Sequence, residues 1–71
     1  QLQATLTTTL SEIMKISSAV RMTALNASIL AAGAGTTGAG FAVVAREIKA
    51  LAETIQDSAN SAEKAMDALR L

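Results

Sequence analysis

The feature that most constrains this chain is an uncharged stretch near its middle, Leu25 to Ala45, which contains all four glycines of the sequence. On both sides of this stretch, apolar residues recur at alternating spacings of four and three residues. That spacing is typical of an amphipathic helix and not of a strand. The simplest interpretation is that one long helix ends within the stretch and the chain turns back there into a second helix.

Position numbers predict how the two helices meet. The positions of Leu30 and Val44 sum to 74, and those of Val20 and Ile55 sum to 75, so the two halves mirror each other about residues 37 and 38. A straight antiparallel hairpin satisfies this relation, whereas a kink or an extra loop residue would break it. We expect helices at about residues 2–34 and 39–70, joined by a turn at about residues 35–38 made of Gly35, Thr36, Thr37 and Gly38.

Each expected helix carries two adjacent apolar seams, which is more than a two-stranded coiled coil requires. A two-helix rod buries one seam and exposes the other, and each exposed Leu, Ile or Phe forgoes about 1.5–3 kcal/mol of burial. We therefore predict an all-α fold, a long antiparallel coiled-coil helical hairpin that dimerises in parallel into a four-helix bundle. No helix-capping pattern precedes Leu2 or follows Leu69, so a fragment of a longer coiled coil is expected.

Composition argues against catalysis and ligand binding. The chain has no cysteine or histidine to activate a nucleophile, and its carboxylates lack metal-ligand spacing. Six basic and six acidic residues cancel, which removes the electrostatic footprint of nucleic-acid binding. The run from Gly33 to Gly38 matches a dinucleotide-binding pattern, but no strand leads into it, so a tight turn explains these glycines better. We expect no enzyme activity, no cofactor and no metal.

A membrane span is the alternative interpretation of the uncharged run between Arg21 and Arg46, which is long enough to cross a bilayer. Polar residues such as Asn26 and Ser28, the four glycines and the predominance of alanine over leucine argue against it. The hairpin turn is therefore the preferred interpretation.

Several short segments between Thr23 and Ala52 carry a family resemblance. They are Ala24-Leu-Asn-Ala-Ser-Ile29, Gly40-Phe-Ala-Val-Val-Ala45, Glu47-Ile48 and Leu51-Ala52. These segments resemble the hairpin tip of methyl-accepting chemotaxis proteins, the bacterial chemoreceptors and transducers of chemotaxis. The resemblance implies a cytoplasmic antiparallel hairpin that dimerises into a four-helix bundle, in agreement with the heptad spacing.

The resemblance also implies protein partners. In the family, the tip binds a histidine autokinase and its coupling adaptor, and dimers associate near the tip into trimers of dimers. Carried over by position, the kinase and adaptor contacts fall on Met22, Asn26, Gly40, Phe41 and Val43, and the dimer–dimer contacts fall on Leu25 and Ile29. The expected function is thus a signal-transducing interaction module in the cytoplasm, attached to a membrane only through parts of the parent protein outside this segment.

Several positions depart from the family pattern, including Ser18, Ala39 and three others near the tip. The family usually has a glutamate where this chain has Leu30, an arginine at Gly33 and a glutamate at Thr36. A second hypothesis therefore stays open, in which the chain is a divergent structural bundle that dimerises or forms arrays without normal kinase activation.

Overall fold

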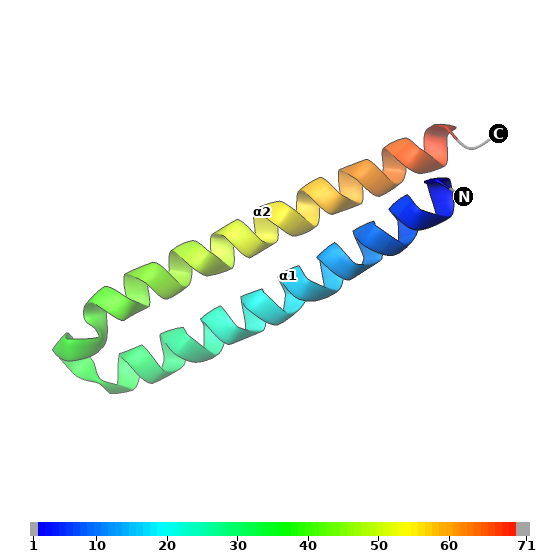
Figure 1. Ribbon diagram of the computed structural model, residues 1–71. Coiled ribbons are helices and arrows are strands. Elements are labelled where there is room, and N and C mark those ends of the chain that lie inside the picture. Colours follow the sequence, from blue (N-terminus) through cyan, green and yellow to red (C-terminus); the bar gives the residue numbers. More distant parts are fainter. Residues whose placement is uncertain (1, 70–71) are drawn as a thin grey trace.

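The computed structural model describes residues 2–69 as two long helices joined by a short turn (Figure 1). Helix α1 spans Leu2–Gly33, the 3₁₀ helix η1 spans Gly35–Gly38, and helix α2 spans Ala39–Leu69. The two long helices lie side by side and antiparallel in a rod of 55 × 15 × 11 Å. This arrangement confirms the predicted all-α hairpin. The expected helix end at residue 70 lies outside the described residues.

The backbone around Gly35 produces the turn. At the end of α1, the Ala34 N–H donates a hydrogen bond of 3.1 Å to the Ala31 carbonyl, which tightens the last turn of the helix. Gly35 then adopts a φ of +64°, a left-handed conformation that costs other residues about 1–2 kcal/mol. After the 3₁₀ turn, the Ala39 N–H donates to the Thr36 carbonyl as α2 begins. The connection is therefore short enough to bring the two helices directly against each other.

Small side chains fill the interface between the two helices, which we call the hairpin seam. Its buried members are spaced seven residues apart along each helix, as expected for one position of a heptad. They are Ser17, Ala24 and Ala31 on α1, and Ala45, Ala52 and Ala59 on α2. Small residues let two helix backbones approach closely, because no bulky side chain holds them apart.

The position of Gly38 shows the register of the seam. A Cβ atom added at Gly38 would collide with the backbone carbonyl of Ala31, so these two residues lie against each other. Their position numbers sum to 69, as do those of Ala24 with Ala45, whose side chains are both buried. The helices therefore mirror each other about residues 34 and 35, and the predicted mirror about residues 37 and 38 is wrong.

The same finding overturns the predicted pairing of large side chains across the hairpin. Leu30 is 76% exposed and Val44 is 52% exposed, so they do not form a buried pair within the hairpin. In a heptad repeat, any seam on one helix can be paired with any seam on the other so that the two position numbers have a constant sum. A constant sum therefore does not show which seams face each other. The structure places alanine inside and the larger apolar residues outside.

The membrane alternative is not supported by the helices of the structure. Over residues 2–69, neither helix combines the length and the apolarity needed to cross a bilayer.

Candidate functional site

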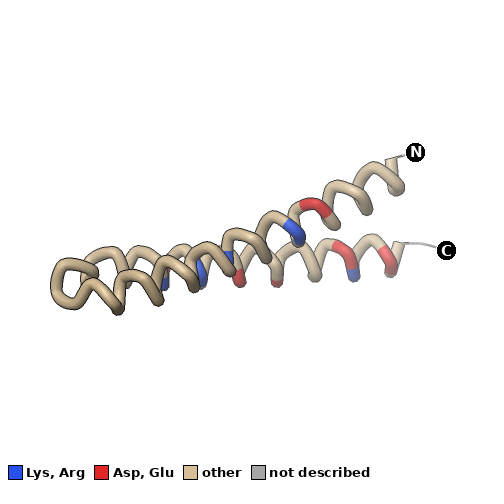
Figure 2. Tube along the Cα trace, turned by 90° about the horizontal axis from the view of Figure 1, so that it is seen from below, with Lys and Arg blue, Asp and Glu red and all other residues tan. Residues whose placement is uncertain are grey.

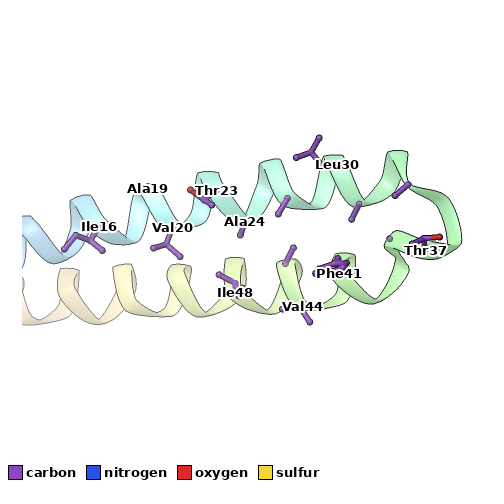
Figure 3. A pocket seen from close by; sticks show the side chains of 15 residues that line it. Ile16, Ala19, Val20, Thr23, Ala24, Leu30, Thr37, Phe41, Val44 and Ile48 are labelled. Atoms are coloured by element: carbon purple, nitrogen blue, oxygen red, sulfur yellow. The ribbon is translucent and has the colours of Figure 1, made fainter.

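An apolar groove runs along one side of the hairpin seam, with a volume of about 730 Å³ (Figure 3). Both helices line it, and it extends from the middle of the hairpin to the turn. Its large lining residues are Ile16, Val20 and Leu30 from α1, and Phe41, Val44 and Ile48 from α2. Alanines lie between them and form much of the floor. We call this surface the apolar groove.

The side chains that border the apolar groove are unusually exposed for their size. Leu30 is 76% exposed and Phe41 is 75% exposed, although both are large and apolar. Covering such a side chain contributes about 1.5–3 kcal/mol, and monomeric proteins rarely leave a large continuous apolar surface uncovered. The apolar groove therefore has the character of a protein–protein interface.

A second set of large apolar side chains lies outside the apolar groove. Met22, Leu25, Ile29 and Val43 are 38–63% exposed, and none of them lines the apolar groove. Successive residues of a helix are about 100° apart, which places Leu25 and Ile29 on the side of Ala24 away from the groove, and Met22 and Val43 on the outer sides of α1 and α2. We call these four residues the flank patch.

The hairpin register brings the members of the flank patch to the same level of the rod. Position 43 of α2 lies opposite position 26 of α1, because their numbers share the sum of 69 that relates Gly38 to Ala31. Val43 is thus level with the segment of α1 between Leu25 and Ile29. Of the residues predicted to contact the kinase or adaptor, Met22 lies beside Ile29 on the outer side of α1, whereas Val43 lies on the outer side of α2, so they do not share one surface.

The other predicted partner-binding residues lie elsewhere. Phe41 borders the apolar groove (Figure 3). Val43, two residues later on α2, is turned by about 200° from it and lies outside the groove. Asn26 and Gly40 are both exposed, and their helical phase directs them away from the hairpin seam, to the outer side of each helix. The five predicted positions therefore surround the tip and do not form a single patch.

The predicted turn residues form the end of the rod. Gly35, Thr36 and Thr37 are exposed, whereas Gly38 is buried against α1. Thr37 also lines the end of the apolar groove nearest the turn (Figure 3). The apolar groove thus continues to the tip of the hairpin.

Charged residues stop short of the turn on both helices (Figure 2). The nearest ones are Arg21 on α1 and Arg46 on α2, and the Arg46 Nε donates a hydrogen bond of 3.4 Å to the Ala42 carbonyl of its own helix. Among residues 2–69, no group of three or more acidic, histidine or cysteine side chains could hold a metal ion. The tip therefore offers apolar contact surface without charge, and binding to it depends on the burial of apolar area more than on ion pairs.

Sequence reasoning missed two features of this surface. It placed Leu30 and Val44 inside the hairpin, and it did not separate the residues that line the groove from those of the flank patch. The signal that could have found both is the strict seven-residue spacing of small residues such as Ala24 and Ala31, since small residues favour the closest helix contact. Once that seam is known, helical phase assigns every other residue to a side.

Comparison with known proteins gives consistent matches. Residues 2–70 match the family model of the methyl-accepting chemotaxis protein (MCP) signalling domain. The chain is 48% identical over 59 residues to methyl-accepting chemotaxis protein PscA of Pseudomonas syringae pv. tomato, an alignment that covers 83% of this chain and 9% of PscA. It is 46% identical over 61 residues to methyl-accepting chemotaxis protein PctB of Pseudomonas aeruginosa, covering 84% of this chain and 10% of PctB.

A relative outside the bacteria is similar to the same region. The chain is 52% identical over 48 residues to transducer protein MpcT of Halobacterium salinarum, covering 68% of this chain and 8% of MpcT. The chain thus spans roughly a tenth of the length of the curated relatives it matches. No solved structure matches it significantly.

Proposed function

Because the chain belongs to the family of methyl-accepting chemotaxis protein signalling domains, we propose that it is the hairpin tip of the cytoplasmic signalling domain of a chemoreceptor. In this role it takes part in signal transduction and controls a histidine autokinase through a coupling adaptor. The family match over residues 2–70 carries the proposal, and the uncharged apolar surface at the tip supports it.

The proposed module is a homodimer. Two hairpins associate in parallel through their apolar grooves, so that Val44, Ile48 and their neighbours become the core of a four-helix bundle. Because both copies present the same surface, a two-fold axis along the rod is the symmetry that such a contact requires. The exposed large residues of the groove support this arrangement, since the hairpin alone leaves them uncovered.

The proposed contacts with other proteins lie around the tip, and all of them except Phe41, which borders the apolar groove, lie outside the dimer core. The kinase and the adaptor contact five residues: Met22, Asn26, Gly40, Val43 and the exposed ring of Phe41. Leu25 and Ile29 of the flank patch contact neighbouring dimers in trimers of dimers. Aromatic and large apolar side chains surrounded by small residues are well suited to this, because they anchor in pockets of a partner while its backbone approaches closely.

Binding to purified partners tests the kinase-control function. The chain is mixed with the histidine kinase and coupling adaptor of its own organism, and complex formation is followed by size-exclusion chromatography with light scattering. We expect a stable complex that Asn26→Ala weakens by about tenfold, which corresponds to about 1.4 kcal/mol. Asn60→Ala is the matched control, because Asn60 is also an exposed asparagine but lies far from the tip on α2. Failure of the unmutated chain to bind, or an equal loss with Asn60→Ala, would contradict the proposal.

A structural role without kinase activation is the second candidate, and Leu30 favours it. Leu30 lines the apolar groove and is 76% exposed, at a position where the resemblance implies a glutamate. A charged side chain there would interrupt the apolar surface, whereas leucine extends the dimer contact toward the tip. Kinase activity in reconstituted arrays separates the two functions. Activity with the unmutated chain supports kinase control, and activity that appears only after Leu30→Glu combined with Gly33→Arg supports the structural role.

A further inference from the structure

Two basic side chains, Arg21 and Lys49, lie opposite each other across the hairpin seam. Their positions sum to 70, close to the sum of 69 that relates Gly38 to Ala31. Arg21 lies between the buried residues Ser17 and Ala24 of α1, and Lys49 lies between the buried Ala45 and Ala52 of α2. Both are half-buried, and neither lines the apolar groove. They therefore meet on the flank side of the seam, below the uncharged tip.

The arrangement leaves one nitrogen of the Arg21 guanidinium, the buried Nε, without a hydrogen-bond partner among residues 2–69. A buried donor without a partner costs about 1–3 kcal/mol, and more when the group is charged. Two like charges in one layer add a repulsion that opposes the packing of α1 against α2.

The charged neighbours of this layer do not remove the imbalance. Arg46, one turn before Lys49, is also basic, and its Nε donates to the carbonyl of Ala42 on its own helix. Glu53, one turn after Lys49, is an exposed acid on the same helix. The layer is thus positive overall, with a single carboxylate at its edge.

We propose that Arg21 and Lys49 form a binding site for a small tetrahedral oxyanion of the phosphate class. A guanidinium group offers parallel N–H donors to two oxygens of such an anion, and a lysine ammonium binds a third oxygen as a compact point charge. The anion would bind the terminal nitrogens of the guanidinium, since the Nε itself is buried, and would neutralise the repulsion between the two basic side chains. Its binding would join α1 to α2 at the base of the tip, and this site does not depend on the proposed kinase control.

Nuclear magnetic resonance of the ¹⁵N-labelled chain tests the site directly. The Nε–H signals of the arginine side chains are followed while sodium phosphate is added, and sodium chloride at equal ionic strength is the reference. We expect a saturable shift of the Arg21 signal with phosphate that is absent with chloride. A linear drift shared by the Arg21 and Arg46 signals, or the same shift with both salts, would overturn the proposal.

Variants separate a specific site from general effects of salt on stability. Lys49→Gln is expected to weaken phosphate binding at least tenfold, whereas Arg46→Gln, which removes a nearby charge outside the layer, should leave it within about twofold. Glu53→Gln should strengthen binding, because it removes the carboxylate at the edge of the site. The melting temperature of each variant is recorded with and without phosphate. An equal increase in the unmutated chain and in Arg21→Gln would show only the general stabilisation that phosphate gives to folded proteins, and would overturn the site.

Discussion

The hairpin seam and the apolar groove are built by the same two helices from opposite kinds of side chain. The seam buries Ala24, Ala45 and Ala52, whereas the groove exposes Leu30 and Phe41. Alanine methyl groups contribute little burial, about 0.8 kcal/mol for each carbon group removed from water, but they allow a close fit. The larger apolar side chains of the groove stay uncovered in the single hairpin and are available for contact with another molecule. The contrast indicates that the seam determines the shape of the hairpin, and that most of the hydrophobic stabilisation is available only on association.

Two adjacent valines give the largest expected effect and the sharpest test of this contrast. Val44 borders the apolar groove, whereas Val43 belongs to the flank patch, and their exposed fractions are 52% and 48%. Val44→Glu removes an apolar contact from each copy of the proposed dimer and buries two like charges, so we expect dimerisation to weaken by about 3 kcal/mol or more. Analytical ultracentrifugation measures the dissociation constant.

Val43→Glu is the matched variant for this experiment. It should leave the dimer intact, because its charge remains in solvent, and should instead lower binding to the kinase and adaptor. If both glutamates weaken dimerisation equally, the apolar groove is not the dimer interface and the contrast between the two flanks fails.

Enlarging a buried alanine of the hairpin seam should destabilise the hairpin. Ala52 is 1% exposed, so Ala52→Leu inserts three carbon atoms where the helices already touch, and we expect a loss of about 1–3 kcal/mol in the free energy of unfolding. Ala50→Leu is the control, because Ala50 is exposed on the same helix. Urea unfolding followed by circular dichroism, at one fixed chain concentration, measures both. Equal stability of the two variants would mean that the seam is loosely packed.

The sequence was sufficient for the hairpin and insufficient for its register. Heptad spacing predicts two helices, and an uncharged glycine-rich stretch predicts the turn between them, because both signals are local. Two sets of residues with the same period could form the inner seam. Leu30 with Val44 and Ala24 with Ala45 satisfy the symmetry equally well. The spacing of small residues favours the second set, and the close approach of Gly38 to Ala31 together with the burial of Ala24 and Ala45 in the folded structure decides between them.

The candidate site was predictable to a similar extent. The resemblance located the interacting region at the tip, but the side on which a residue lies depends on the register. Phe41 and Val43 are two positions apart in the sequence and lie on opposite sides of α2, only Phe41 bordering the groove, since two residues advance a helix by about 200°. If the wrong seam is assumed, a residue of the proposed dimer interface is therefore assigned to the surface proposed to contact the kinase and adaptor, or the reverse.

The turn brings the seam into register, and Gly35 supplies its one left-handed residue among those described. With φ at +64°, Gly35→Ala forces a side chain into the left-handed region, and we expect a loss of about 1–2 kcal/mol in the free energy of unfolding. Gly40→Ala is the control, since Gly40 is helical and a Cβ atom there meets nothing within 4 Å. That variant should gain up to about 1 kcal/mol from helix propensity. Thermal unfolding measures both, and a gain in stability with Gly35→Ala would contradict the left-handed turn.

The smallest effect concerns a polar member of the seam's edge, Ser28. Its Oγ is buried and has no hydrogen-bond partner among residues 2–69, so Ser28→Ala removes an unsatisfied group and makes the edge more like the alanine seam. We expect a gain of about 1 kcal/mol in the free energy of unfolding. Ser11→Ala is the control, because Ser11 is exposed on the same helix and should gain only the helix propensity of alanine, about 0.5 kcal/mol. The difference between the two variants isolates the cost of burying the hydroxyl. A Ser28→Ala chain no more stable than Ser11→Ala would show that the hydroxyl finds a partner in solution, and that polarity at the edge of the seam does not oppose the closure of the hairpin.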